Sequence, residues 1–424
     1  MKRPRAATLV LLLLGSPALA AEDAGAPPRC VPASAKEVTP ELERLDAALR
    51  REPGEPVLVF EQAIAHAQLC DRERTLDRLR AVAATYGGLD PGSFRGFAFL
   101  REDPEFQAIV RGIRSRNPPV LSSRPAYVLE ERGLFPEGMA FDRRTGRVYS
   151  GGSRRRVVWT DRAGKLRVLV PAGAAGLGFV AGNAVDAGRD RLCVASSSSI
   201  GNGGDLPDAV TGILCFALAD GTPVRTLRLP PGRTGFLNDL AIDPATGALY
   251  TTNTTTGAVF TARLGDQVLS ELLPDGAVPG ANGITLDPAG RSLFVAGDEG
   301  ITRIDLRTRV ARRLERRPPV VDGSLDGLYF HRGTLVGIQN GVHPGRVVRF
   351  VLDPGLGRIL RMEVLEAYAP WMDSPTTGAI DGDTFLYLAN TQLGRMLRDP
   401  DAGGGEPSPV QVRRIPLGRV ATSR

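Results

Sequence analysis

Apolar and polar positions from Pro125 onward follow a recurring unit: a polar residue, a short apolar strand, a tight turn and a second apolar strand. The unit is clearest at 236–253, FLNDLAIDPATGALYTTN. Its best echoes are PEGMAFDRRTGRVYSG at 136–151, ANGITLDPAGRSLFVAG at 281–297 and LDGLYFHRGTLVGIQ at 325–339. Short apolar runs divided by Gly, Pro and Asp predict β-strands joined by tight turns.

One polar side chain occupies the same phase in each copy, counted back from the second strand. Three copies place it eleven residues before that strand and two copies with a shorter turn place it nine residues before, while a sixth copy is weaker. The set is Glu137, Asn183, Asn238, Asn282, Asp326 and Thr377. Neighbouring members such as Asn183, Asn238 and Asn282 lie 55 and 44 residues apart. This period, with four strands per unit, predicts a six-bladed β-propeller over 125–424.

The strand AYVLEE, at 126–131, precedes the first copy. We expect it to complete the last blade, which would close the ring and leave no free sheet edge.

Residues 37–116 instead carry apolar positions at helical spacing. Helices are expected at 41–50, 57–69 and 72–86. The phrase FAFLREDPEFQAIVRGIR, at 97–114, resembles the end of a tetratricopeptide-like helix pair. One or two such repeats are fewer than the roughly three that a free-standing solenoid needs, so we expect the module to lean on the propeller or on a protein partner. The expected fold is therefore an all-β propeller with a small N-terminal α-helical domain, joined by a linker at 117–124.

The first 20 residues have the pattern of a secretory signal peptide, because basic residues precede an apolar run that ends in a small-x-small cleavage site. A retained membrane anchor is the competing interpretation, but the run at 6–14 is far shorter than the roughly 20 residues of a bilayer span. Residues 21–36 are rich in Ala and Pro and are expected as a flexible lead-in. The chain is thus predicted to be periplasmic or secreted, without a membrane span after cleavage.

Charge and cysteines narrow the picture further. The formal charge of +6 falls to +3 once the three basic residues of the leader are removed, and no aromatic pattern interleaves the arginine runs, so no nucleic-acid partner is expected. Four cysteines in an exported chain permit two local disulfides, Cys30 with Cys70 and Cys193 with Cys215. Free buried thiols remain an alternative for the second pair, since LCVA and ILCFA also have the pattern of core strands.

The innermost strand of each propeller blade lines the central channel, so the residues of the common phase are expected to converge near the axis. Two carboxylates, Glu137 and Asp326, and several amide oxygens are hard ligands that suit Ca²⁺ better than Zn²⁺. No histidine or cysteine occupies this phase. A calcium site, or a site for another divalent cation, is the natural inference.

At these residues the chain resembles the six-bladed propellers of the regucalcin and gluconolactonase family, with a more distant likeness to squid diisopropyl fluorophosphatase and paraoxonase. The resemblance covers roughly Pro125 to the C-terminus. It implies a catalytic divalent cation held or bordered by a glutamate of the first blade, asparagines of the third and fourth, and an aspartate of the fifth. The matching positions are Glu137 in PEGMAFD, Asn238 in FLNDLAID, Asn282 in ANGITLD and Asp326 in LDGLYF.

Other polar residues are expected around this site. Asp326 could also act as base or nucleophile, and His343, in QNGVHPG, is a candidate acid or base, against a loop histidine without a role. Asn183 is expected to touch the ligands or the substrate, and the likeness to paraoxonase adds Asp239 as a residue near the metal. Asn253, Asn340 and Asn390 end second strands and could face the cavity or simply cap turns. The long loop at 196–211 has the pattern of a lid or specificity loop.

Two hypotheses of function follow. The first is an exported, calcium-dependent hydrolase of lactone-like or related esters, with a small-molecule substrate. The second is a non-catalytic scaffold that binds a protein or small molecule and holds a structural calcium. Because propellers host many functions, the fold alone does not choose between them. The residues of the common phase favour the enzyme, whereas the helical module favours protein binding.

Overall fold

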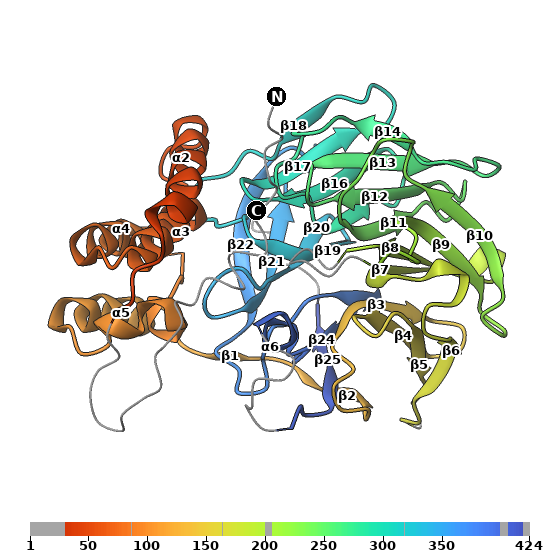
Figure 1. The fold of residues 1–424 in the computed structure, drawn as a ribbon, viewed down its shortest axis with the longest axis horizontal. Helices are drawn as coiled ribbons and strands as arrows, with labels where there is room; N and C mark the ends of the chain where they lie inside the picture. Colours follow the sequence, from red (N-terminus) through yellow and green to blue (C-terminus); the bar gives the residue numbers. More distant parts are fainter. Residues whose placement is uncertain are drawn as a thin grey trace.

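A computed structural model of the chain describes residues 30–85, 87–162, 164–199, 206–317, 319–398 and 406–418. The expected signal peptide at 1–20 and most of the lead-in lie outside the described residues. In the described residues, six antiparallel sheets form a ring, and a group of helices lies against one side of it (Figure 1). The six-bladed propeller with N-terminal helices is thereby confirmed.

Each of the first four blades is a consecutive run of four strands, ordered from the channel outward. Blade 1 contains β3 (Pro136–Asp142), β4 (Arg147–Gly152), β5 (Val157–Thr160) and β6 (Arg167–Val170). Blade 2 contains β7 (Phe179–Asp186), β8 (Arg191–Ser197), β9 (Gly212–Ala217) and β10 (Pro223–Arg228). Blade 3 contains β11 (Leu237–Ile242), β12 (Leu249–Asn253), β13 (Ala258–Ala262) and β14 (Ser270–Leu273). Blade 4 contains β15 (Ile284–Leu286), β16 (Ser292–Gly297), β17 (Gly300–Asp305) and β18 (Ala311–Arg313).

The last two blades each take a strand from before the first blade. Blade 5 contains β19 (Leu325–His331), β20 (Thr334–Gln339), β21 (Arg346–Leu352), β22 (Ile359–Ala367) and the added β1 (Val120–Leu121). Blade 6 contains β23 (Gly378–Asp381), β24 (Thr384–Leu388), β25 (Val410–Pro416) and β2 (Arg124–Leu129). The expected closure of the ring is therefore confirmed, because β2 pairs antiparallel with β25. The segment 117–124, expected as a linker, contains β1, since its backbone pairs with the free edge of β22.

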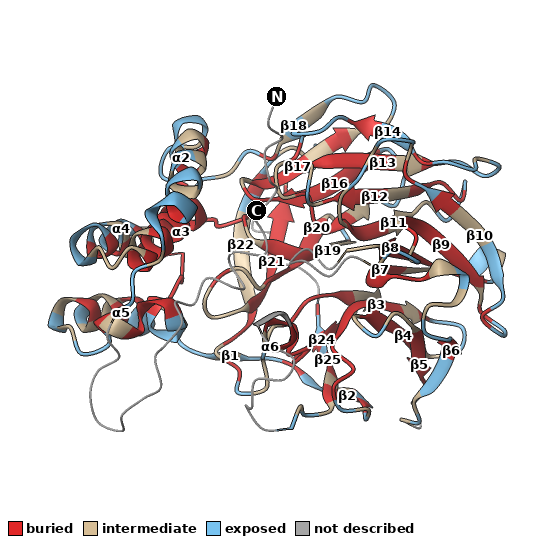
Figure 2. Ribbon diagram, viewed as in Figure 1, coloured by how far each residue is buried: buried red, intermediate tan, exposed pale blue. Residues whose placement is uncertain are grey.

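The apolar runs become strands because both faces of each middle strand are buried between blades (Figure 2). Alternate side chains of one strand serve opposite neighbours: Leu335 packs toward blade 4, whereas Val336 packs toward blade 6. The outer strands β6 and β10 begin with exposed residues, as expected at a sheet edge that faces solvent.

The N-terminal helices are defined by side-chain caps. They are α2 (Ala35–Arg51), α3 (Pro56–Gln68), α4 (Arg72–Ala84) and α5 (Pro104–Arg116), with the short 3₁₀ turns η1 (Pro91–Ser93) and η2 (Arg95–Leu100) between the last two. Asp71 and Asp103 accept hydrogen bonds from backbone amides in the first turns of α4 and α5, which supplies partners that a helix start otherwise lacks. α2 begins at Ala35, slightly before the expected start of the helical segment. Three further short helices lie in the propeller: η3 (Ala174–Gly176), η4 (Ala187–Arg189) and α6 (Leu393–Arg398).

The helical segment leans on the propeller, as expected for so short a module. One apolar cluster combines Phe60 of α3 with Val321 and Val342 of the propeller. Buried Arg346 of β21 donates a hydrogen bond from Nη1 to the carbonyl oxygen of Gly87 at 2.6 Å. The two parts therefore share a core and a buried polar contact.

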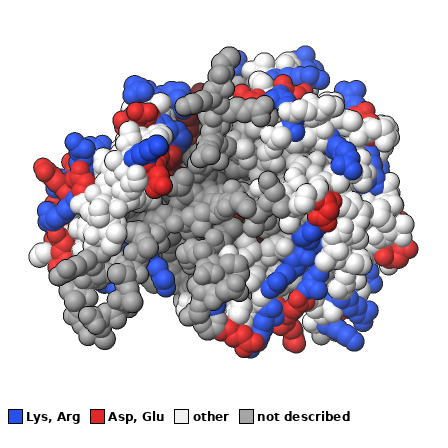
Figure 3. Space-filling model, in the orientation of Figure 1, with Lys and Arg blue, Asp and Glu red and all other residues white. Residues whose placement is uncertain are grey.

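Both disulfides that the sequence permits form, so the alternative of free thiols at Cys193 and Cys215 is not realised. Cys30 is joined to Cys70, and Cys193 to Cys215 across the paired strands β8 and β9. Two disulfides fit an oxidising compartment such as the periplasm or the extracellular space. In the part of the chain that the structure describes, no helix has both the length and the apolar character needed to cross a bilayer. Acidic and basic side chains are intermixed over the helices (Figure 3).

Candidate functional site

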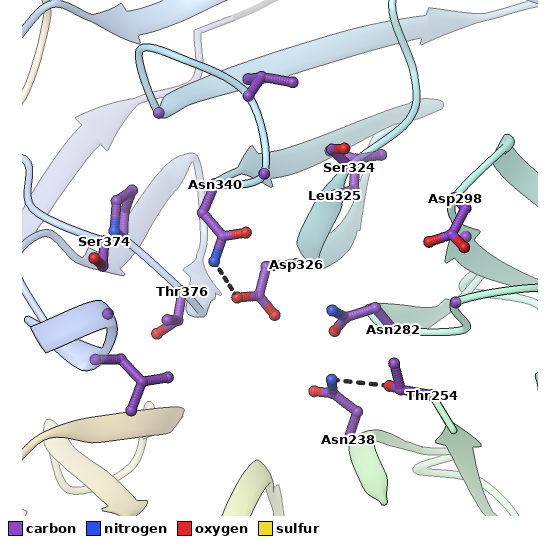
Figure 4. Close-up of a pocket in the computed structure, with 18 of the residues that line it drawn as sticks. Asn238, Thr254, Asn282, Asp298, Ser324, Leu325, Asp326, Asn340, Ser374 and Thr376 are labelled. Atoms are coloured by element: carbon purple, nitrogen blue, oxygen red, sulfur yellow. Dashed lines mark hydrogen bonds between the residues drawn. The ribbon is translucent and has the colours of Figure 1, made fainter. Parts of the chain in front are cut away.

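The candidate ligands of blades 1, 3, 4 and 5 occupy equivalent places in the sheets. Each lies four residues before the inner-strand partner of one apolar residue near the start of the second strand, which is Val148, Leu249, Leu293 or Leu335. The residues are Glu137, Asn238, Asn282 and Asp326. In blades 1, 3 and 5 the strand register shifts at this point, a β-bulge that re-aims the side chain. Figure 4 shows Asn238, Asn282 and Asp326 pointing toward one another.

Each of these four side chains is buried and presents one oxygen that has no hydrogen-bond partner. The atoms are Glu137 Oε2, Asn238 Oδ1, Asn282 Oδ1 and Asp326 Oδ1. Unpartnered buried oxygens are rare in proteins, because burial removes water without replacing its hydrogen bond. Four such oxygens at one place indicate a binding site for a group that is held by oxygen atoms.

Neighbouring hydroxyl and amide groups fix the orientation of two of these side chains. Thr254 Oγ1 donates its hydrogen to the carbonyl oxygen of Ala281 at 2.7 Å, so it can only accept from Asn238 Nδ2, at 3.0 Å. The Asn238 amide must therefore turn its oxygen to the cavity. Asn340 Nδ2 donates to Asp326 Oδ2, which leaves Oδ1 of that carboxylate free (Figure 4).

Three buried carboxylates lie close together around the channel. Burial raises the pKa of Asp326 and of Asp239 to about 7 each, and raises the pKa of Glu137 well above its usual range, where the charges of Asp326 and Asp239 add to the effect. No arginine or lysine among the described residues forms an ion pair with them. Such a group of acids lacks a compensating cation.

Among the described residues, no three side chains of the types His, Cys, Asp and Glu gather as a metal centre. The expected set contains only two such side chains, Glu137 and Asp326, together with two asparagines. Whether these residues suit a calcium ion is therefore judged from the four free oxygens. They form the all-oxygen donor set that Ca²⁺ prefers.

Asp239, expected near the metal, interacts with the charges of Glu137 and Asp326, but both of its oxygens are bonded to the backbone. Its Oδ1 accepts from the backbone N–H of Leu240 at 2.8 Å and its Oδ2 from that of Ile284 at 3.1 Å. The carboxylate thus ties the inner strand of blade 3 to that of blade 4 and does not line the cavity.

The ring position of blade 2 is a correction to the sequence phase. Val185 pairs with Leu192, seven residues later, the same separation that Ile242 and Leu249 show in blade 3. The turn of blade 2 is therefore not shortened, and the equivalent position is Ala181 rather than Asn183. Asn183 lies outside the cavity lining, and its buried amide group has no partner. The same reasoning moves the blade 6 position from Thr377 to Thr376, which lines the cavity.

The three asparagines at the ends of second strands differ in role. Asn340 lines the cavity and contacts Asp326. Asn253 donates to the carbonyl oxygen of Thr234 at 3.1 Å, and Asn390 accepts from the backbone N–H of Gln411 at 2.7 Å. Both hold loops and stay away from the cavity lining, as the turn-capping alternative describes. The described residues of the 196–211 loop likewise do not line the cavity.

His343 lies where the helical segment meets the channel mouth. It lines the cavity, and its ring lies 4.5 Å from that of Phe94, centroid to centroid. Burial lowers the pKa of His343 to about 4, because the imidazolium form loses its hydration there. The ring is therefore neutral at pH 7 and able to accept a proton.

The cavity over these residues has a volume of about 690 Å³ and is lined by both parts of the chain. The propeller contributes Glu137, Asn238, Asn282, Asp326, Asn340 and His343. The helical segment contributes Arg44, Arg51, Ser93, Phe94 and Arg95. This second group was missed by sequence reasoning, since no periodicity or motif within 37–116 shows which face meets the channel.

Comparison with solved structures identifies the fold. A gluconolactonase from Xanthomonas campestris superposes with a TM-score of 0.50 at 18% identity, covering 71% of this chain and 91% of its own. The chain shares the propeller fold of this gluconolactonase. The expected resemblance to gluconolactonase-like propellers is thus confirmed at the level of fold. An identity of 18% shows the fold alone, so the activity has to be argued from the residues of the site.

Two further structures match less well. A protein described as a putative oxidoreductase (glucose dehydrogenase) from Thermus thermophilus has a TM-score of 0.46 at 15% identity, covering 69% of this chain and 99% of its own. A luciferin-regenerating enzyme has a TM-score of 0.46 at 16% identity, covering 68% of this chain and 94% of its own. No protein-family model matches the sequence, and no curated protein matches it.

Proposed function

We propose that the chain is an exported, calcium-dependent hydrolase of lactone-like or related ester substrates. The observation that carries this proposal is the set of four free, buried oxygens on four different blades. These oxygens converge on the floor of a cavity large enough for a substrate. The gluconolactonase shares the fold only, so the preference for a hydrolase over a passive scaffold rests on these oxygens and the cavity above them.

Glu137, Asn238, Asn282 and Asp326 would hold the cation, with two carboxylates to balance its charge. When bound, Ca²⁺ supplies a positive charge that polarises a carbonyl or phosphoryl oxygen. It also removes the electrostatic cost of the buried acids described above, because an opposite charge favours their ionised form.

The remaining roles fall to residues of the cavity. Asn340 orients the Asp326 carboxylate through its hydrogen bond to Oδ2. His343, neutral at pH 7, would accept a hydrogen bond from an attacking water and so orient it. The water oxygen then bonds to the carbonyl carbon and the ester C–O bond breaks. The proton released by the water passes to the leaving oxygen, so an acid and an alcohol result.

The proposal is tested with the purified mature chain and a panel of a lactone, an aryl ester and an organophosphate, each with and without a chelator. Asp326→Ala is expected to lower kcat/KM by about 100-fold or more, since it removes one of the groups that hold the cation. Ca²⁺ affinity, measured by calorimetry, should fall in parallel. Asp381→Asn, at the other end of an inner strand, is the matched control and should leave both unchanged.

Chelator-insensitive turnover, or an Asp326→Ala variant equal to the parent, would contradict the hydrolase. Tight Ca²⁺ binding without turnover on the whole panel would instead support the non-catalytic scaffold with a structural calcium.

A further inference from the structure

The cavity is larger than a single sugar ring requires. Its volume of about 690 Å³ lies within the range of about 300–1,000 Å³ that is typical for ligands of drug size. A substrate that fills it must extend beyond the group that lies over the polar floor.

Two walls beyond that floor are aromatic. Phe179 begins β7 of blade 2 and Phe236 precedes β11 of blade 3, and their rings lie 5.5 Å apart, centroid to centroid. Phe94 of the helical segment packs on His343 of blade 5. In a ring of six, blade 5 stands opposite blade 2, so the walls face one another across the channel mouth.

The wall that carries Phe94 is fixed in place. The backbone N–H of Asp90 donates to the carbonyl oxygen of His343 at 2.5 Å. The buried Asp90 carboxylate is itself held by Arg114 Nε at 2.6 Å and by the Tyr368 hydroxyl at 3.1 Å. These hydrogen bonds hold the backbone before Phe94 against the propeller. A pre-organised binding surface requires such a fixed backbone.

We infer that the cavity takes esters or lactones with an aryl group, and that Phe94 of the helical segment is a specificity-determining residue for that group. This inference rests on the proposed hydrolase for the reacting end of the substrate. The apolar group lies between the two aromatic walls, while the ester lies over the oxygen-lined floor. The helical segment is then part of the substrate site.

The test compares kcat/KM for 1-naphthyl acetate with that for glucono-δ-lactone in the full mature chain. Phe94→Ala is expected to lower kcat/KM for the naphthyl ester by about 10-fold, mainly through KM, because the loss of one large apolar contact costs about this much. The value for the small lactone should fall by less than that for the naphthyl ester, because only the contact of Phe94 with His343 affects both substrates. Phe94→Leu, which restores apolar volume, should recover most of the loss.

Phe99→Ala is the matched control, since Phe99 is a half-buried phenylalanine of the same 3₁₀ turn that does not line the cavity. It should leave the ratio of the two substrates unchanged. Circular dichroism checks that each variant is folded. An equal fall for both substrates in Phe94→Ala, or an equal change of the ratio in Phe99→Ala, would overturn the inference.

A binding measurement separates this inference from the proposed reaction. N-(1-naphthyl)acetamide, whose amide replaces the reactive ester, is titrated into the calcium-loaded chain by calorimetry. Weaker binding to Phe94→Ala than to the parent and to Phe99→Ala would support the aromatic site even if no substrate of the panel turned over. Metal-dependent turnover with identical amide binding in all three chains would sustain the hydrolase and overturn the role of Phe94.

Discussion

At the scale of single residues, acidic side chains are buried at the boundary between the helices and the propeller. Glu61 of α3 accepts from Arg44 Nη2 at 3.1 Å, and the same guanidinium lies 3.6 Å from Asp298 of the propeller. Burial, together with the charge of Asp298, raises the pKa of Glu61 to about 8. Burial of Glu61 is therefore most favourable when its carboxyl group is protonated, whereas the contact with Arg44 favours the ionised form.

The stability of the chain should depend on pH through this residue. Because the folded-state pKa is raised above the usual value of 4.5, the contribution of Glu61 is complete below about pH 4.5 and is lost as the pH rises through about 8. Glu61→Gln, which cannot ionise, is expected to gain about 2 °C or more in Tm over the parent between pH 5 and pH 8.5. Thermal unfolding at several pH values measures this.

Glu43→Gln, an exposed change on α2, is the control and should follow the parent at every pH. A Glu61→Gln variant that loses stability relative to the parent at high pH would show that the ion pair with Arg44 outweighs the burial of the acid.

The four candidate ligands could be predicted from sequence because the pattern that marks them is local. Glu137, Asn238, Asn282 and Asp326 each stand at a fixed distance before a recognisable strand. Asn183 was misplaced because the equivalent residue of blade 2, Ala181, is apolar, and Asn183 is a polar residue only two positions later. The local sequence pattern thus predicts the position of the candidate ligand on the inner strand only where the length of the following turn can be read from the sequence.

At the scale of the strand, a glycine follows the ring residue in four blades: Gly138, Gly182, Gly283 and Gly327. The inner strands crowd together near the axis, and a Cβ on Gly283 would lie 2.2 Å from the carbonyl oxygen of Asp326. The phrases ANGI and DGL are therefore explained in part by packing. In blade 3 the corresponding place is Asp239, which bridges to the next strand by a hydrogen bond.

Gly283→Ala should consequently damage both fold and site. Overpacking against the backbone of blade 5 is expected to cost about 1–3 kcal/mol in the free energy of unfolding. It should also weaken Ca²⁺ binding, because the contacted carbonyl belongs to Asp326. Denaturant titration and calorimetry measure the two effects.

Gly112→Ala is the matched control. This glycine lies in α5 with open space around it, so alanine should stabilise the chain by about 0.5–1 kcal/mol. A Gly283→Ala variant with unchanged stability would show that the inner strands can move apart at no cost.

At the scale of the whole molecule, the helices and the propeller share one apolar cluster and a buried arginine contact. We therefore expect a single cooperative unfolding transition. Fluorescence of Trp159 and Trp371 reports the propeller, and circular dichroism in the far ultraviolet is sensitive to loss of the helices. The two denaturant curves should coincide.

Arg346→Ala removes the buried contact to Gly87 and should separate the curves, with the helical signal lost first. Two transitions in the parent chain would mean that the shared cluster does not couple the parts.

The helical part of the site could not have been predicted from sequence. The pattern at 37–116 gives the helices, because helical spacing is local, but docking depends on surfaces far apart in the chain. Phe94 reaches the channel through contacts with His343, which lies in the fifth blade, far along the chain. The periodicity of a sequence reflects only local structure, so it does not predict such a long-range contact.

The closure of blade 6 has a consequence for how the protein matures. Strand β2 is synthesised early and its partner β25 almost last, so the earlier strand must wait for the final segment of the chain before the ring exists. Blades 1 and 6 also meet at their inner ends, where the Thr376 hydroxyl donates to the carbonyl oxygen of Glu137 at 2.8 Å. A chain interrupted before Val410 lacks β25, so its sixth sheet has no strand to join β2 to β24 and the ring stays open.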